Sequence, residues 1–218
     1  LDSMFPDIKL RGQHTMVVDQ EYDWNFDHEI LPIDETAAYM LDWGDPWVGK
    51  DVPANIEHGT AVVGLIAGQG NGTGYAINGI APASDMRVAN IGLGEGVMSG
   101  PSLYGEPVGP PGSAPIDQLV VGSIFTIEVQ RKGMTTTSSG CVVGDGTSSP
   151  MVTGCVPMEA SKYIHSVIQD GTATGNVIVE GAGNGSVDLS TDAAKPKDVE
   201  FSYFSDPDKD SGAIMVGA

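Results

Sequence analysis

Residues 57–68 read Glu-His-Gly-Thr-Ala-Val-Val-Gly-Leu-Ile-Ala-Gly, and this stretch decides the predicted fold. The apolar residues after His58 recur at the spacing of a buried helix, which predicts a helix that opens at or just before this histidine. They are Val62, Val63, Leu65 and Ile66. The positive end of the helix dipole would then lie at the imidazole and favour its neutral form, which suits a general base. A histidine that only caps or packs against the helix is the structural alternative.

The length, charge and apolar content of the whole chain limit the classes of protein to which it can belong. Its 218 residues are enough for one sizeable core, so a single domain is expected over 1–218. The net charge of −19 makes nucleic acid and anionic membrane surfaces poor partners. No stretch approaches the roughly 18 apolar residues of a membrane span, and the first residues lack a signal-peptide pattern. We therefore expect a processed N-terminus and no membrane.

The two cysteines, Cys141 and Cys155, flank a Gly/Ser/Thr-rich segment without helical or strand periodicity. Two thiols are too few for a structural zinc site, and no histidine lies at the usual spacing from either. A disulfide is the preferred interpretation, and it indicates an oxidising, extracellular location. Two unpaired buried cysteines are the alternative. The pair marks an expected loop insertion at about 131–156.

Short apolar runs that end on polar residues are typical of open parallel α/β sheets. One run, Thr15–Asp19, ends on a carboxylate, and a later one leads into the glycine-bracketed Asn184. Further strands are expected at 85–92, 123–130 and 211–218, and a helix at 157–170. Taken alone, each of these polar residues is more often a turn residue.

Three segments resemble blocks of the subtilisin-like serine peptidases, in the order in which that family has them. The string from His58 through Asn71-Gly-Thr-Gly to Gly79-Ile-Ala-Pro resembles the histidine block. Asp19, followed nine residues later by His-Glu-Ile-Leu, is similar to the aspartate block. Ala-Gly-Asn184-Gly is similar to the block that supplies the oxyanion asparagine.

One departure from the family is visible in the aspartate block. The family's glycine two residues after the aspartate is Glu21 here. The chain is therefore expected to belong to a divergent, secreted bacterial-type branch.

The resemblance implies a three-layer α/β fold with a mainly parallel central sheet flanked by helices. It also implies that Asp19 orients the imidazole, that His58 takes the serine proton, and that Asn184 meets the oxyanion. The substrate would be a polypeptide, bound through its main chain beside the end of a strand. The residues expected there are Glu128, Val129 and Gln130.

The nucleophilic serine is not in its expected place. The family has it in a Gly-Thr-Ser-x-x-x-Pro block downstream of the last strand, whereas this chain ends at Ala218. Gly-Thr-Ser148 is similar, but it is two residues short before the proline and precedes the asparagine block. We expect Ser148 to be dispensable and the serine helix to lie in a remaining C-terminal segment, so that this chain alone is incomplete.

Two alternatives remain open. A non-catalytic relative, or a fragment, could use the same cleft to bind peptide without cutting it.

The chemistry requires no cofactor, and structural calcium is possible from the acidity and the loop 71–78. The sequence identifies no metal ligands.

Overall fold

The computed structural model describes residues 12–21, 24–31, 53–70, 78–90, 119–132, 155–183, 189 and 201–217. The chain divides into two compact units, Leu1–Thr126 and Ile127–Ala218.

Unit one is built around a strand, helix, strand sequence. Strand β1 covers Met16–Glu21, helix α1 covers Pro53–Ala67, and strand β2 covers Asp85–Asn90. Strands β1 and β2 are parallel, with Val17 opposite Met86 and Asp19 opposite Val88. Strand β3, Ile124–Ile127, begins in the same unit. A helical connection between neighbouring parallel strands is the expected crossover.

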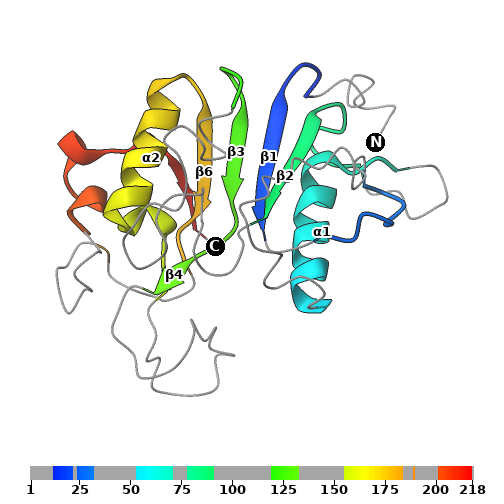
Figure 1. Cartoon of the computed structure of the whole chain (residues 1–218), viewed down its shortest axis with the longest axis horizontal. Coiled ribbons are helices and arrows are strands. Elements are labelled where there is room, and N and C mark those ends of the chain that lie inside the picture. Colours follow the sequence, from blue (N-terminus) through cyan, green and yellow to red (C-terminus); the bar gives the residue numbers. More distant parts are fainter. Residues whose placement is uncertain are drawn as a thin grey trace. The chain divides into compact units, whose positions relative to one another are not determined.

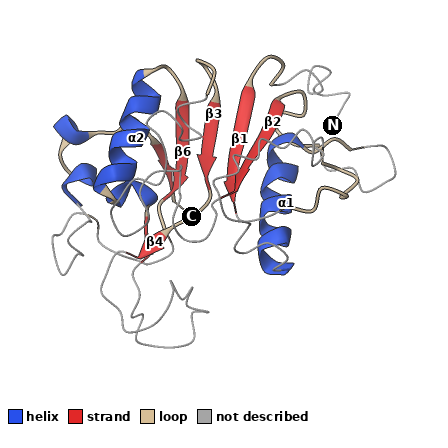
Figure 2. Ribbon diagram, in the orientation of Figure 1, coloured by secondary structure: helices blue, strands red, loops and turns tan. Residues whose placement is uncertain are grey.

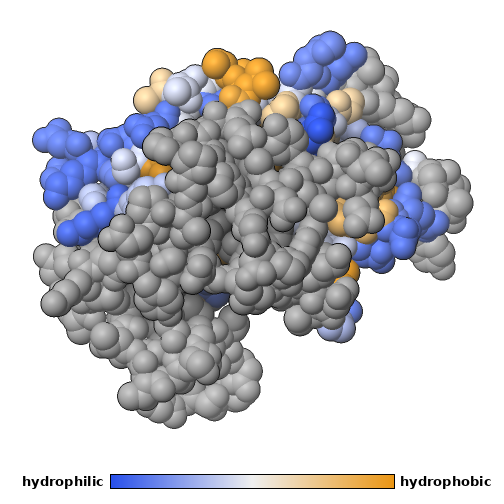
Figure 3. Space-filling view, in the orientation of Figure 1, coloured by the Kyte–Doolittle hydropathy of each residue, from blue (hydrophilic) through white to orange (hydrophobic). Residues whose placement is uncertain are grey.

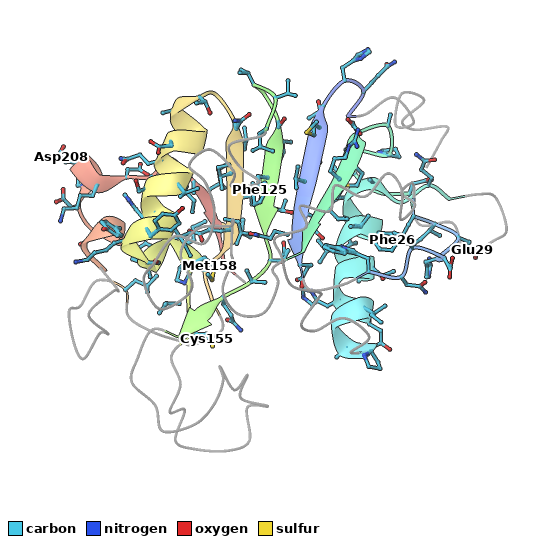
Figure 4. The ribbon with its side chains drawn as sticks, viewed as in Figure 1. Phe26, Glu29, Phe125, Cys155, Met158 and Asp208 are labelled. Carbon is cyan, nitrogen blue, oxygen red and sulfur yellow. The ribbon has the colours of Figure 1, made fainter. Side chains whose placement is uncertain are left out.

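The core of unit one lies between α1 and the strands. Side chains alternate along a strand, so every second residue of β1 faces the same way. The buried residues of the core of unit one are Val17, Trp24, Val63, Ala67, Met86 and Val88. Phe26 packs against this core and lies beside α1 (Figure 4).

Helix α1 corrects the predicted start of the histidine helix. It begins at Pro53, five residues before His58. Proline suits the first helical position because it needs no N–H partner there, and the residues up to Glu57 extend the helix without an apolar stripe. The apolar period could not reveal this extra turn. The helix dipole therefore has little effect on the His58 ring, because it acts mainly within the first turn and His58 lies beyond that turn. Leu65, predicted to be buried, is also exposed.

The C-terminal end of α1 is closed by the segment around Gly79. The backbone N–H of Gly79 donates to Gly68 O at 2.8 Å, that of Ile80 to Leu65 O at 3.0 Å, and that of Ala81 to Ile66 O at 2.7 Å. These bonds satisfy carbonyl groups that a helix end leaves without partners. A Cβ on residue 79 would lie 2.6 Å from the backbone N of Ala67, so only glycine fits.

Unit two contains the remaining elements. The strands are β4 (Arg131–Lys132), β5 (Cys155–Val156), β6 (Val177–Gly181) and β7 (Ile214–Val216). The helices are η4 (Met158–Ala160), α2 (Lys162–Ala173), η5 (Phe201–Phe204) and η6 (Pro207–Lys209). The helix predicted at 157–170 is thus divided into η4 and α2, because Ser161 between them has extended backbone angles.

Helix α2 packs on β6 and also holds the segment that leads into β7. Ile168 of α2 and Ile178 of β6 are both fully buried. At the segment that leads into β7, three α2 side chains one or two turns apart bond to consecutive main-chain carbonyls. The contacts are His165 Nε2 to Lys209 O at 2.6 Å, Gln169 Nε2 to Asp210 O at 3.4 Å, and Thr172 Oγ1 to Ser211 O.

The strands form a mainly parallel five-stranded sheet in the order β2-β1-β3-β6-β7, and β4 and β5 form a separate antiparallel pair (Figures 1 and 2). The predicted α/β class with a mainly parallel sheet and helices is confirmed. Phe125 of β3 is fully buried (Figure 4). No helix of the described ranges is long and apolar enough to cross a membrane.

Gln20 on β1 gives a prediction of increased stability. Its side chain is fully buried, and neither amide atom has a hydrogen-bond partner among the described residues. An unsatisfied buried polar group costs about 1–3 kcal/mol. Gln20→Met keeps the length of the side chain and removes both polar atoms, so it is expected to raise the free energy of unfolding by about 1–3 kcal/mol in urea denaturation.

Gln69 supplies the matched control. Its amide Nε2 donates to Pro82 O at 2.8 Å, so Gln69→Met loses a bond that is made and should not stabilise. A lower free energy of unfolding for Gln20→Met would contradict the buried, unsatisfied amide.

Candidate active site

The centre of the candidate site is a close contact between a histidine of α1 and a carboxyl group at the end of β1. His58 Nδ1 lies 2.7 Å from Glu21 Oε1. The Glu21 side chain is 4% exposed, whereas that of His58 is 56% exposed. A carboxylate at Nδ1 accepts the proton of that nitrogen and leaves Nε2 as the acceptor nitrogen of the neutral ring. His58 is therefore a partly exposed base whose Nδ1 contacts the buried Glu21 carboxyl group.

Asp19 is engaged elsewhere. It is fully buried, and its carboxylate accepts hydrogen bonds from Trp24 Nε1 at 3.1 Å and Thr126 Oγ1 at 2.9 Å. We predicted that Asp19 would orient His58, whereas the carboxylate in contact with the ring is that of Glu21. Both acids share one face of β1 because they are two residues apart. The longer side chain at the very end of the strand makes the contact with His58.

The segment after β1 is fixed to the helix that carries His58. The backbone N–H of Asn25 donates to Thr60 Oγ1 at 2.8 Å, and that of Gln69 donates to Ile30 O at 2.9 Å. The Trp24 ring is buried in the core of unit one. One contact near the middle of α1 and one just past its C-terminal end therefore fix this segment against the helix that carries His58.

The residues predicted to bind substrate belong to unit two. Glu128 is exposed, Val129 is buried, and Gln130 is half-buried. The strand predicted at 123–130 is shorter, because β3 ends at Ile127 and these three residues continue outside the sheet.

Asn184 and the other half of the cysteine pair fall outside the described residues. The strand predicted before Asn184 is present as β6, and Gly183 has a φ of 85°. A Cβ on Gly183 would lie 2.7 Å from Cys155 O, so glycine is required directly before the asparagine. Cys155 is disulfide-bonded, while Cys141 and Ser148 also lie outside the described residues. The convergence of Asp19, His58 and Asn184 stays a prediction.

Metal binding has no support in the described ranges. They contain no group of three or more His, Cys, Asp or Glu residues placed to hold a metal ion. Most of the loop 71–78, where calcium was considered, lies outside them.

Sequence reasoning missed the partners of both acids. Glu21 was noted only as a departure from the family glycine, and Trp24 and Thr126 were given no role. The sequence did contain one signal for Glu21. Side chains alternate along a strand, so residues 19 and 21 lie on the same face, and Glu21 could have been considered beside Asp19. Thr126 carries no such signal, because it lies 107 residues from Asp19 in the chain.

No protein-family model matches the chain, and no curated protein matches it. The resemblance to subtilisin-like peptidases therefore rests on the sequence blocks. Function has to be argued from the residues of the site, because a general α/β fold hosts many activities.

Proposed function

We propose that the chain carries the aspartate, histidine and asparagine parts of a secreted serine endopeptidase of the subtilisin type. The observation that carries the proposal is the 2.7 Å contact between His58 Nδ1 and the buried Glu21 carboxylate. A histidine with one nitrogen on a carboxylate and the other on a partly exposed edge is arranged as a general base. The acidic chain, with a net charge of −19, also disfavours nucleic-acid substrates.

In the proposed mechanism, His58 Nε2 takes the proton of a serine hydroxyl as it attacks the peptide carbonyl. The ring becomes an imidazolium, and the Glu21 carboxylate stabilises its positive charge without moving. Asp19 is the second carboxylate of the site, held by Trp24 and Thr126. By resemblance, the Asn184 amide donates to the developing oxyanion, and no cofactor is needed.

The strand order supports a site at this place. It changes direction between β1 and β3, since β2 lies on one side of β1 and β3 on the other. Open α/β sheets bind ligands at such a switch point, beside the carboxyl ends of the strands. Asp19 and Glu21 lie in the carboxyl-terminal half of β1. The finer assignment, a three-layer subtilisin-like fold, is part of the proposal.

We further propose that a serine-bearing segment covers one face of β6 and β7. In their parallel register, Val179 pairs with Ile214 and Gly181 with Val216, so the side chains of Val179, Ile214 and Val216 share a face. Ile214 is 54% exposed and Val216 is 53% exposed. Parallel sheets are normally covered on both faces, and an apolar face open to water favours a further packed element.

Exposed apolar side chains are not confined to that face. Val120 and Val121 are exposed in the segment before β3, and the space-filling view has a hydrophobic patch at that end of β3 (Figure 3). What distinguishes the face of β6 and β7 is that its exposed apolar side chains lie on paired strands of one sheet.

The deciding experiment compares this chain with a longer product that carries a Gly-Thr-Ser block after Ala218. Both are treated with a fluorophosphonate, which labels activated serines, and both are assayed with a peptide substrate. We expect label and activity in the longer product only. A longer product that stays unlabelled and inert, but binds peptide, would replace the peptidase by the peptide-binding relative.

A further inference from the structure

A buried pair of carboxyl groups joins three segments of unit two. Glu159 lies on η4 and Glu180 on β6, and both side chains are buried. The backbone N–H of Glu159 donates to Glu180 Oε2 at 3.3 Å. The Ser211 hydroxyl, in the segment before β7, donates to Glu159 Oε2. Ala213 N donates to Ser211 Oγ at 3.2 Å, which directs the hydroxyl proton to the carboxyl group.

The surroundings supply little positive charge for two carboxylates. Within the described ranges, neither forms an ion pair with a lysine or arginine. The charged and titratable groups that face Glu159 are Glu180 on β6, His165 on α2 and Asp210 before β7. Glu180 Oε1 has no hydrogen-bond partner among the described residues, whereas Oε2 accepts from the backbone N–H of Glu159, so only one oxygen of this buried carboxyl group has a described donor. Two carboxylates that share a water-poor site cannot both ionise easily.

The proton affinities agree with this geometry. Burial raises the pKa of Glu180 well above its ordinary value, and the charge of Glu159 raises it further. Burial also raises the pKa of Glu159, against the hydrogen bond from Ser211 and the charge of His165, which both lower it. The two groups titrate as a pair rather than independently.

We propose that Glu159 and Glu180 share one proton in the folded protein and act as a pH-sensitive clamp on η4, β6 and the segment leading into β7. The clamp does not depend on the peptidase proposal, because none of its residues belongs to the candidate active site. Its function is conformational, since it holds unit two most firmly in acid and loosens it as the pH rises.

The sign of the effect follows from linkage. The folded state binds the shared proton more tightly than the unfolded chain, whose glutamates have ordinary pKa values. The stability that the pair contributes is therefore complete below the ordinary pKa and is lost as the pH rises through the raised pKa of the folded pair. In that window, the ratio of folded to unfolded protein falls by up to about tenfold per pH unit for one proton.

The test is urea unfolding of the full chain from about pH 4 to about pH 8, with Glu180→Gln as the main variant. Glutamine has nearly the same shape and stays neutral at every pH. We expect the variant to match the wild type in acid and to become relatively more stable as the pH rises, by up to about tenfold per pH unit. Asp208→Asn removes an exposed carboxylate on η6 and should follow the wild-type pH dependence.

A second measurement can be made on the wild type alone. The infrared carbonyl band of a protonated carboxylic acid should persist in the wild type at pH values above the ordinary glutamate pKa, where exposed glutamates have lost it. In a folded Glu180→Gln variant this band should disappear. The proposal is overturned if the wild type lacks the band, or if Glu180→Gln keeps the wild-type dependence of unfolding on pH. Neither result would bear on peptidase activity.

Discussion

The His58→Ala variant of the serine-bearing protein is expected to hydrolyse peptides more slowly by a factor on the order of 10⁴ to 10⁶ in kcat. Without the imidazole, no group takes the serine proton, and the Glu21 carboxylate is left without its 2.7 Å partner. A base and its nucleophile act as a unit, so losing either costs nearly the whole effect. Steady-state kinetics with a peptide substrate measures it.

Two further variants assign the carboxylate that works with His58. Glu21→Gln should reduce kcat by roughly 10²- to 10⁴-fold, because the amide can bind the wrong tautomer and cannot balance an imidazolium. Asp19→Asn tests the family assignment in the same assay, and a loss confined to it would restore Asp19 as the orienting acid. Glu57→Gln removes an exposed charge next to His58 and should stay near the wild-type rate. A His58→Ala variant with full activity would exclude the proposed mechanism.

Gly79→Ala is expected to lower the free energy of unfolding by about 3 kcal/mol, the upper end of the usual cost of overpacking. The added methyl group would lie 2.6 Å from the backbone N of both Ala67 and Gly68. Because these are backbone atoms at and just after the end of α1, no side chain can rotate away to make room. The segment would have to move, and the three hydrogen bonds that close the helix would weaken.

Urea denaturation of Gly79→Ala beside Gly181→Ala provides the measurement. A Cβ on Gly181 meets nothing within 4 Å, so this variant should unfold near the wild-type midpoint. Equal stability of the two variants would mean that the end of α1 is not packed against residue 79.

The strands were predictable because short apolar runs leave a strong signal. Such runs marked β1, β2, β6 and β7 to within a few residues, and the polar residues after the β1 and β6 runs indicated the open α/β class. Element boundaries set by polar residues were not predictable. The first turn of α1 buries no apolar stripe, and the break at Ser161 depends on backbone angles that the apolar period does not encode.

The site was predictable in its residue types but not in its pairing. A strand ending in acids followed by a histidine helix indicated an acid and base arrangement. Which acid meets His58 depends on side-chain reach and on what else binds each carboxylate. Asp19 is bound by Trp24 and Thr126, and the second of these comes from a strand that only the folded sheet brings close.

The way α2 holds the segment before β7 has a consequence for sequence variation. The acceptors are the main-chain oxygens of Lys209, Asp210 and Ser211, which every residue type supplies. The donors are the side chains of His165, Gln169 and Thr172, which few residue types can replace. Substitutions in the segment before β7 leave these bonds intact because they keep the main-chain oxygens. Substitutions of the three donor residues on α2 remove the bonds. The position at which β7 begins therefore depends on the side chains of α2 and not on those of the segment before the strand.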